Sequence, residues 1–421
     1  MAIQNNFPNI RPTLNLNFAL SKRVDPRITF VRSTTATYFD QDGILQTAAA
    51  NQGRITFDPA TLDCQGLLIE EQRTNLCLQS ENFATTWTVS GASISTNTII
   101  APNATLTGDS LVEDTSAGSA HRVGQAFTAD PTVTYTATCF VKAAGRTWAR
   151  FLLDDNSGNS CIGWFNLSTG VVGSTANAGT GSGAAVSITA AGNGWYRCVL
   201  TGKPATTNNS NVRFQVSGTT GDSVSSYTGD GTTSIYLWGA QLEAGAFATS
   251  YIPTTTTALT RNADAASMTG TNFSSWYNAS EGTLFSESIN LPGQSAVVFP
   301  RIANINDGTT NNVITTVWRS DTSRLYGAVT VSGVNVAEVG VVGVTQTNAN
   351  KIALGYATNN FAASVNGGAV NTDTSGAVPT GLTALGIGRQ ASAADFINGT
   401  IRRIAYYPVR VTNAQLQALT G

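Results

Sequence analysis

Short runs in which apolar and polar residues alternate fill most of the chain, and turn-forming residues separate them. Every second residue from Leu14 to Leu20 is apolar, which predicts a strand with one buried face. The dipeptide Asp42-Gly43 lies between two such runs and predicts a hairpin, because glycine accepts the positive φ that a tight turn requires. Helical periodicity is almost absent. The pattern therefore predicts a nearly all-β protein.

The alternation continues in two later regions, residues 81–257 and 258–421. In the earlier one we expect strands at 135–142, 147–153, 195–200, 212–216 and 234–238, a spacing typical of a jelly roll. In the later one we expect a second β-sandwich, with strands at 282–289, 313–318, 325–331, 351–357, 361–365 and 399–406. Asn366-Gly367 predicts a further hairpin turn after the fifth of these strands.

The ends of these regions carry their own signals. Residues 1–80 contain few apolar runs, so we expect an N-terminal β-rich region that docks onto another protein or a sister copy. A Thr-rich joint, Pro253–Thr257, has too few apolar residues for a core and predicts a domain boundary. Thr412 and Gln415 form a capping box, which predicts a short C-terminal helix whose leucines dock onto the sandwich.

The composition narrows the choice of partners. The charged fraction, 11%, is less than half of the roughly 25% typical of soluble domains, so threonine, serine, asparagine and glycine must cover the surface. Lys and Arg number 23 and Asp and Glu 25, a net charge of -2, so we expect neither nucleic acid nor an anionic membrane as a partner. Residues 1–8 lack the basic and apolar stretches of a secretory signal, and no run is long enough to insert into a bilayer, so we expect folding in a cytoplasm.

Cysteine and histidine are too sparse for most metal and hydrolase sites. The five cysteines are an odd number without a CxxC pair, so we expect reduced, mostly buried thiols. The single histidine, His121, has no matching acidic motif nearby, and a hydrogen-bonded strand residue is favoured over a general base or a pH switch.

The acidic pairs do not suggest catalysis. Glycoside hydrolysis needs two carboxyl groups about 5 to 9.5 Å apart. Glu70-Glu71 and Asp154-Asp155 are adjacent pairs, and neighbouring strand residues point to opposite faces. We therefore expect a protein that is not an enzyme, with no catalytic residue and no cofactor. Asp154 and Asn156 carry oxygens of the kind calcium prefers, but the stretch lacks the closing Glu of a calcium loop, so a turn is favoured over this weak calcium site.

Tryptophans supply the candidate binding residues. Most of them should be core, because sandwiches need large inward-facing side chains. Arg146, Trp148 and Arg150 alternate along one strand, and two arginines are costly to bury unpaired, so their face is expected to be exposed or in an interface. An exposed indole stacks on the apolar face of a sugar ring, which makes these three residues a candidate glycan site. Trp318, followed by Arg319, is a weaker candidate of the same kind.

Several stretches resemble a known group of proteins. Residues 25–43, beginning Asp25-Pro26-Arg27, and residues 66–76, Gly-Leu-Leu-Ile-Glu-Glu-Gln-Arg-Thr-Asn-Leu, resemble the N-terminal region of bacteriophage head-spike and tail-fibre-type virion proteins. Residues 135–142, 194–197 and 237–253 are similar to the carbohydrate-binding-module-like jelly rolls of the same proteins. Residues 365–368, 385–389 and 398–407 resemble concanavalin-like, laminin-G-type lectin sandwiches.

The resemblance implies a structural protein of the phage particle, assembled in the host bacterial cytoplasm. It implies a virion-attachment region in residues 1–80 that contacts other virion proteins of the capsid or tail, followed by a jelly roll and a lectin-like sandwich that present a host-surface or glycan-binding face. Appendages of this kind are commonly trimeric, so a homotrimer is expected. The alternative is a tail-spike depolymerase that hydrolyses host polysaccharide.

Overall fold

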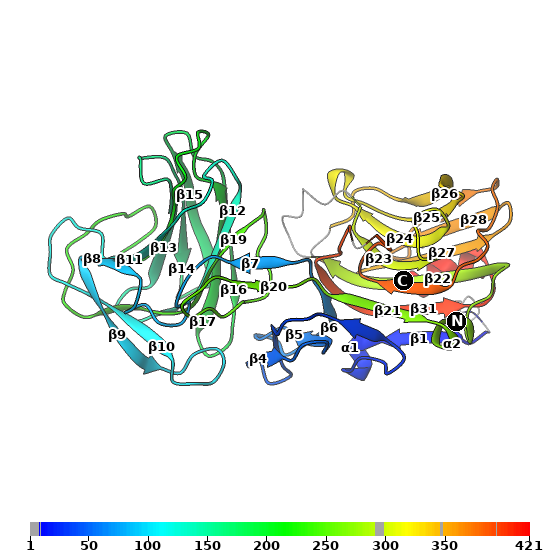
Figure 1. Cartoon of the computed structure of the whole chain (residues 1–421), viewed down its shortest axis with the longest axis horizontal. Coiled ribbons are helices and arrows are strands. Elements are labelled where there is room, and N and C mark those ends of the chain that lie inside the picture. The colour runs from blue at the N-terminus through cyan, green and yellow to red at the C-terminus, as the bar shows by residue number, and fades with distance from the viewer. Residues whose placement is uncertain (1–7, 9, 291–298, 346–347, 393) are drawn as a thin grey trace.

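The computed structural model describes residues 8, 10–290, 299–345, 348–392 and 394–421. Residues 1–7, on which the expectation about a secretory signal rests, lie outside the described residues. Four large antiparallel sheets confirm the all-β prediction, and they are arranged in two lobes (Figure 1). In the described part of the chain, no helix is both long and apolar enough to cross a membrane.

The first lobe is a jelly roll of two six-stranded sheets. Its strands are β8 (Thr88–Ser90), β9 (Ala92–Ile99), β10 (Gly108–Glu113), β11 (Arg122–Phe127), β12 (Tyr135–Ala143), β13 (Trp148–Asp154), β14 (Ser160–Asn166), β15 (Val171–Ala178), β16 (Ser182–Ala190), β17 (Trp195–Lys203), β18 (Val212–Thr219) and β19 (Thr233–Ala244). One sheet has the order β16-β17-β12-β19-β10-β9, and the other, the β13 sheet, has the order β15-β14-β13-β18-β11-β8. Phe151 packs against Phe165 and Phe214 between them, with ring centroids 4.8 and 5.3 Å apart.

The second lobe is a larger sandwich built from both ends of the chain. The N-terminal part supplies β1 (Leu14–Asn17), β2 (Thr29–Val31), β3 (Ala36–Phe39), β4 (Leu45–Ala48), β5 (Arg54–Phe57) and β6 (Cys64–Ile69). The C-terminal part supplies β21 (Ala265–Thr269), β22 (Glu281–Asn290), β23 (Arg301–Asn306), β24 (Val313–Arg319), β25 (Arg324–Val331), β26 (Val334–Val341), β27 (Asn350–Ala357), β28 (Asn360–Val365), β29 (Asn371–Asp373), β30 (Ala384–Ile387) and β31 (Gly399–Tyr407).

The N-terminal strands complete the two sheets of this sandwich. One sheet has the order β29-β28-β27-β22-β31-β6-β5, with β1 also on β31, and the other has the order β2-β21-β30-β23-β24-β25-β26. Leu16 and Leu67 share one hydrophobic core with Leu284, Ile404 and Tyr406. Residues 14–69 therefore obtain their core from the last third of the chain, and the jelly roll is inserted between the two parts.

Two short strands connect the lobes. The chain enters the jelly roll through β7 (Arg73–Asn75) and returns through β20 (Leu259–Arg261), and these strands pair antiparallel, as Figure 1 shows. The side chain of Asn75, fully buried, donates to the carbonyl oxygens of Ala240 and Ile252 at 3.1 and 2.8 Å. The connection is thereby fastened to the jelly roll.

A buried ion network holds the junction on the side of the larger lobe. Asp264 forms ion pairs with Arg32, whose Nη1 lies 2.9 Å from it, and with Arg54, whose Nη2 lies 2.6 Å from it. Arg54 Nη2 also contacts Glu70 Oε2 at 2.8 Å, and Glu70 accepts from the backbone N–H and the hydroxyl of Ser250 at 2.6 and 2.7 Å. Because Ser250 follows the last jelly-roll strand, this network joins the N-terminal region, the jelly roll and the C-terminal region.

The charges of the network set the protonation of Glu70. Burial alone would raise its pKa, but the charges of Arg261 and Arg54 and the hydrogen bonds from Ser250 overcome that effect and lower the pKa to about 2. Glu70 is therefore ionised at neutral pH although its side chain is only 1% exposed.

Local signals were mostly confirmed, with one correction. Strands β3 and β4 form the predicted hairpin, in which Gly43 has a φ of 72°. Helix α3 (Asn413–Thr420) carries the complete capping box, and Leu416 is buried. The predicted strand through Leu20 is wrong in its second half, because the Asn17 side chain caps a single helical turn, α1 (Phe18–Ser21). Leu20 consequently faces solvent and is 78% exposed.

In the described part of the chain, two further short helical turns occur. They are α2 (Thr271–Ser274) and a 3-10 turn (Ser320–Thr322).

Candidate functional site

The outer surface of the β13 sheet carries an unusual set of polar side chains. In β13 the alternate residues Ala149, Phe151 and Leu153 are buried in the jelly-roll core, so Trp148 and Arg150 point away from it. The same alternation in the neighbouring strands brings more residues to this surface. We call it the polar face, and it comprises Arg122, Trp148, Arg150, Asp154, Trp164, Arg213, Gln215 and Ser217.

Strand register aligns four residues of the polar face with Ser90 of β8 in one row. Ser90 of β8 lies opposite Arg122 of β11, and Arg122 lies opposite Ser217 of β18. Ser217 in turn lies opposite Arg150 of β13, and Arg150 lies opposite Trp164 of β14. Neighbouring strands are about 4.8 Å apart, so the row crosses the sheet from edge to interior over about 20 Å.

The arginines of this row are positive charges without carboxylate partners. Among the described residues, neither Arg122 nor Arg150 forms an ion pair, and Arg150 Nε is buried without a hydrogen-bond partner. The Arg150 guanidinium lies over the Trp164 ring, 5.7 Å from its centroid. Burial, together with the charge of Arg122, lowers the pKa of Arg150, while Asp154 opposes this. An anion placed between the two guanidinium groups would relieve both costs.

Trp148 lies at the border of this face beside a covering loop. The loop between β18 and β19 reaches back over β14, where Trp164 Nε1 donates to the Val224 carbonyl oxygen at 3.0 Å. Asp222 of the loop accepts from the Ser174 hydroxyl at 2.8 Å. A Cβ atom at Gly173 would lie 2.6 Å from both the Trp148 ring and Asp222, so a glycine is required where strand, ring and loop meet. Trp148 itself is half-buried.

A small groove overlaps one end of the row and runs over β8, β11 and β18. Its volume is about 180 Å³, and Arg122, Arg213, Gln215 and Asn156 line it together with Thr88 and Ser90 of β8. Arg213 and Gln215 are held by Asp154, whose carboxylate accepts from Arg213 Nη2 at 3.0 Å and from Gln215 Nε2 at 2.8 Å. One side of the groove is therefore held in place by the hydrogen bonds of Arg213 and Gln215 to Asp154, and another side carries Arg122, which forms no ion pair with the described residues.

The structure separates Arg146 from the other two predicted residues. Strand β13 begins at Trp148, and Arg146 lies in the preceding turn, where it pairs with Glu113 and with Asp230 at 3.2 Å. Burial raises the pKa of Glu113, but hydrogen bonds from Arg146 and Tyr227 outweigh it and lower that pKa. Arg146 therefore ties the turn before β13 to β10 and to the loop before β19.

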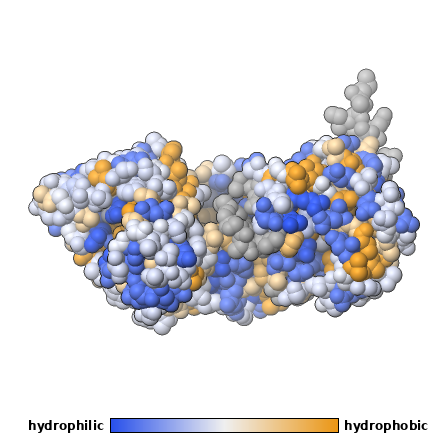
Figure 2. All heavy atoms as spheres, turned by 90° about the horizontal axis from the view of Figure 1, so that it is seen from above, coloured by the Kyte–Doolittle hydropathy of each residue, from blue (hydrophilic) through white to orange (hydrophobic). Residues whose placement is uncertain are grey.

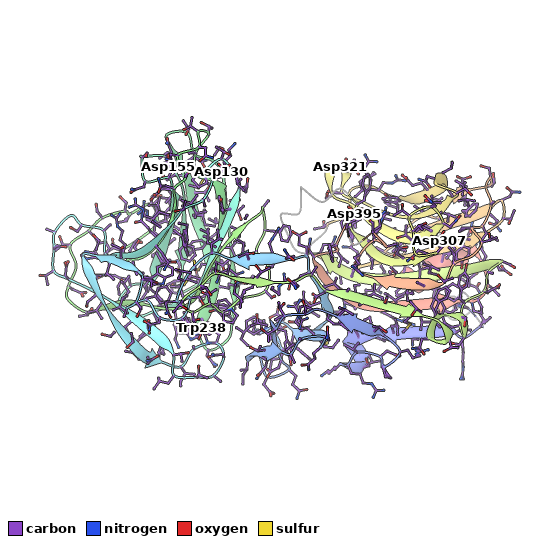
Figure 3. All side chains as sticks on the ribbon, in the orientation of Figure 1. Asp130, Asp155, Trp238, Asp307, Asp321 and Asp395 are labelled. Atoms are coloured by element: carbon purple, nitrogen blue, oxygen red, sulfur yellow. The ribbon has the colours of Figure 1, made fainter. Side chains whose placement is uncertain are left out.

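The second predicted pair, Trp318 and Arg319, does not present an exposed indole. Trp318 is fully buried in the core of the larger sandwich, so the prediction of an exposed indole there is wrong. Inward and outward positions alternate along β24, and Trp318 occupies an inward one. Arg319 points outward and pairs with Asp321 at 2.9 Å. Asp321 is labelled in Figure 3 at the end of this lobe that lies toward the jelly roll.

Asp154 and Asn156, the weak calcium candidate, lie at the turn between β13 and β14 that the sequence favoured there. Asp154 is engaged by Arg213 and Gln215, and its backbone neighbour Asn156 donates to it at 2.8 Å and has a φ of 59°. Asp155, labelled in Figure 3, accepts from the side-chain amides of Asn159 and Asn209 at 2.7 and 3.0 Å. These carboxylates hold the turn between β13 and β14, and among the described residues no group of three or more acidic, histidine or cysteine side chains is placed to hold a metal.

His121 is a core residue next to the start of β11. It is fully buried, its ring lies 4.6 Å from the Tyr227 ring, and its nitrogens face the carbonyl oxygens of Gly91 and Tyr227. This agrees with a hydrogen-bonded structural role.

The residues that the sequence reasoning missed are Arg122, Trp164 and Arg213. Each alternates with core residues of its own strand, so its outward direction could be read from the sequence. Their meeting with Arg150 depends on the pairing of four strands, which no local pattern specifies.

Comparisons with known proteins give only weak similarities. No protein-family model and no curated protein matches the chain. Among solved structures it is similar to the CBM40 of Ruminococcus gnavus IT-sialidase bound to alpha2,3 sialyllactose, with 18% identity, a TM-score of 0.30 and coverage of 34% of this chain and 84% of that chain. It is also similar to domains LG4-5 of the mouse laminin alpha1 chain, with 10% identity, a TM-score of 0.23 and coverage of 67% and 84%. Scores this low describe all-β architecture, and we draw no functional argument from them.

Proposed function

We propose that the protein is a structural component of a bacteriophage particle whose jelly roll binds an anionic glycan of the host surface on the polar face. The observation that carries the binding proposal is the row containing Arg122 and Arg150, two guanidinium groups without carboxylate partners beside the indoles of Trp148 and Trp164. A carboxylate or sulfate on a sugar satisfies such a pair bidentately, and the half-buried indole of Trp148 offers apolar surface to the ring, while the buried Trp164 supports Arg150 from below.

The role in a phage particle is supported by the sequence resemblance of residues 25–43 and 66–76 to virion proteins. We place the attachment surface on the N-terminal part of the larger lobe, where Leu20 and Val31 are 78% and 51% exposed. On this proposal the protein is a homotrimer that contacts capsid or tail proteins through that surface and presents the jelly roll to the host.

The binding proposal is tested with Arg150→Gln and Arg122→Gln, which keep a polar side chain but remove the charge. Wild-type protein should bind carboxylated or sulfated oligosaccharides, probed with oligogalacturonate and heparin fragments, more tightly than neutral ones. Each variant should weaken this binding by about 1.5 to 3 kcal/mol, the range for a hydrogen bond to a charged group. Arg319→Gln, on the other lobe, is the matched control and should bind as wild type does.

Two outcomes would count against the proposal. Equal binding of neutral and anionic oligosaccharides by wild type would show that Arg122 and Arg150 do not select an anionic ligand. Release of oligosaccharides from host polysaccharide incubated with the purified protein would favour the depolymerase alternative instead.

A further inference from the structure

A second concave site lies where the jelly roll meets the chain that leaves it. This joint groove has a volume of about 510 Å³ and is lined by Gln79, Glu81, Asn82, Asn97, Thr107, Pro253, Thr254, Thr255, Thr257 and Leu259. It includes the Thr-rich segment that the sequence marked as a boundary. It lies away from the polar face, and none of its lining residues belongs to the β13 sheet.

The wall of the groove is fixed by backbone hydrogen bonds. Gln79 N donates to the Thr255 carbonyl oxygen at 2.6 Å, and Ser80 N donates to the Thr254 carbonyl oxygen at 3.2 Å. The Thr254 hydroxyl donates to the Cys77 carbonyl oxygen at 2.6 Å. The Thr-rich segment is therefore held rigidly against residues 77–80, and the groove exists before any ligand arrives.

Glu81 is the one lining residue with a charge, and it has no cation to balance it. Its Oε1 accepts a hydrogen bond from the Tyr251 hydroxyl at 3.1 Å. Among the described residues Oε2 receives no hydrogen bond, and Glu81 forms no ion pair. The side chain is half-buried, and burial raises the pKa of Glu81 while the Tyr251 bond lowers it. A half-buried carboxylate with a free oxygen on a preformed groove is typical of a ligand site.

The remaining lining side chains are neutral hydrogen-bonding groups. Asn97 has a φ of 55° in a register shift of β9, and its side-chain amide makes no hydrogen bond to the described residues. Thr257 is exposed and its hydroxyl is likewise free. Thr107 accepts from Trp238 Nε1 at 3.0 Å, so the aromatic cluster of Trp238 and Tyr251 lies directly behind the groove.

We propose that the joint groove binds a neutral saccharide unit, with Glu81 Oε2 accepting from a sugar hydroxyl and Asn97 and Thr257 making the flanking hydrogen bonds. A single carboxylate among amides and hydroxyls matches a ligand that offers several uncharged O–H donors and acceptors. The joint groove thus carries one carboxylate and no basic residue, whereas the polar face carries the two arginines proposed to bind an anion. The inference therefore does not rest on the proposed function.

The test uses the full chain and maltotriose, cellotriose and lactose as neutral probes, with saturation-transfer NMR as the readout. Wild type should bind at least one of them. Glu81→Gln should weaken that binding by about tenfold or more, the loss expected for a charged acceptor, and Thr257→Val should weaken it less. Glu81→Gln retains an oxygen that can accept from Tyr251, so the thermal unfolding midpoint should stay near that of wild type.

The matched control is Asp130→Asn, which lies at the opposite end of the jelly roll from Trp238 in Figure 3 and should not alter neutral-sugar binding. Absence of binding to all three probes, or binding that is unchanged in Glu81→Gln, would overturn the inference. Tighter binding of a chitosan trimer than of any neutral probe would also overturn it, because a cationic sugar would then be the ligand of Glu81. Binding of anionic glycans to the polar face is a separate readout, so the two proposals fail independently.

Discussion

Trp148 is the residue on which a binding role and a packing role are most easily separated. It is half-buried at the border of the polar face, whereas Trp318 is fully buried in the larger sandwich. Trp148→Ala should weaken glycan binding by about 1 to 3 kcal/mol and lower the free energy of unfolding by less than about 1.5 kcal/mol. Trp318→Ala, the matched comparison, should lower it by about 3 to 5 kcal/mol.

Chemical denaturation and glycan titration of the two variants decide this point. A loss of stability in Trp148→Ala as large as that in Trp318→Ala would assign Trp148 to the core and leave Arg122 and Arg150 as the whole site.

Glu70 is a buried charged residue whose loss should destabilise the fold strongly. Glu70→Gln leaves Arg54 and Arg261 buried with one carboxylate fewer, and an uncompensated buried charge costs about 3 to 5 kcal/mol of unfolding free energy. Asp321→Asn breaks an exposed pair with Arg319 and should cost about 1 kcal/mol or less. Urea unfolding of the two variants measures the difference, and equal small losses would contradict the structural role of the network.

The same residue gives a dependence on pH. The pKa of Glu70 in the folded protein, about 2, is below its ordinary value of 4.5, so its stabilising contribution is complete above about pH 4.5 and is lost as the pH falls toward 2. The stability difference between wild type and Glu70→Gln should therefore shrink over that interval. A difference that stays constant down to pH 2 would contradict the assigned pKa.

At the scale of single residues, the sequence predicted part of the candidate site. Trp148 and Arg150 were found because they alternate along one strand and a pair of arginines on that face is costly to bury. Arg122 and Trp164 were not found, because they reach the same row only through cross-strand register. Trp318 was assigned wrongly because one polar neighbour, Arg319, says nothing about which face of a strand an indole occupies.

At the scale of elements, alternation located the strands with an apolar stripe and missed those without one. Strands β12, β13, β17, β22 and β31 all overlap their predicted ranges. Strands β9 and β16 are rich in serine, threonine and alanine and are mostly exposed or half-buried. In β9 little apolar alternation marks the strand, whereas β16 was missed although Ala184, Val186 and Ile188 alternate toward the core. Their place in the sheet is determined by the neighbours to which they bond.

Pairing between distant strands was beyond the reach of local patterns. Strand β6 pairs with β31 through Ile69 and Gly399, residues more than three hundred positions apart. The sequence showed that residues 1–80 were too poor in apolar runs for a core of their own, but it could not show that the missing partner was the last third of the same chain.

At the scale of the whole molecule, the surface has the low charge that the composition predicts. Pale, intermediate hydropathy dominates the jelly-roll lobe in Figure 2, with blue and orange areas small and scattered, as expected when threonine, serine and glycine replace charged residues. Specific association of such a protein must depend on a few distinct features rather than on net charge.

The exposed apolar side chains of the N-terminal part are such features and carry the attachment proposal. Leu20→Glu should leave the thermal unfolding midpoint nearly unchanged, because Leu20 is 78% exposed, yet it should reduce the incorporation of the protein into particles. Val334→Glu, at a position 63% exposed on β26, is the matched control and should incorporate normally. Immunoblots of purified particles measure this, and equal incorporation of both variants would move the attachment surface elsewhere.

The paired strands β7 and β20 have a consequence for how such a molecule can change over generations. Both crossings between the lobes lie side by side, with Asn75 opposite Leu259, so the jelly roll begins and ends at one point on its host sandwich. A recombination event that exchanges everything between these two residues would replace the jelly roll as one unit without interrupting the core that residues 14–69 share with the C-terminal part, and the incoming unit would need to replace the hydrogen bonds of Ser250 to Glu70. The architecture thus allows one lobe to be exchanged while the other keeps its own evolutionary history.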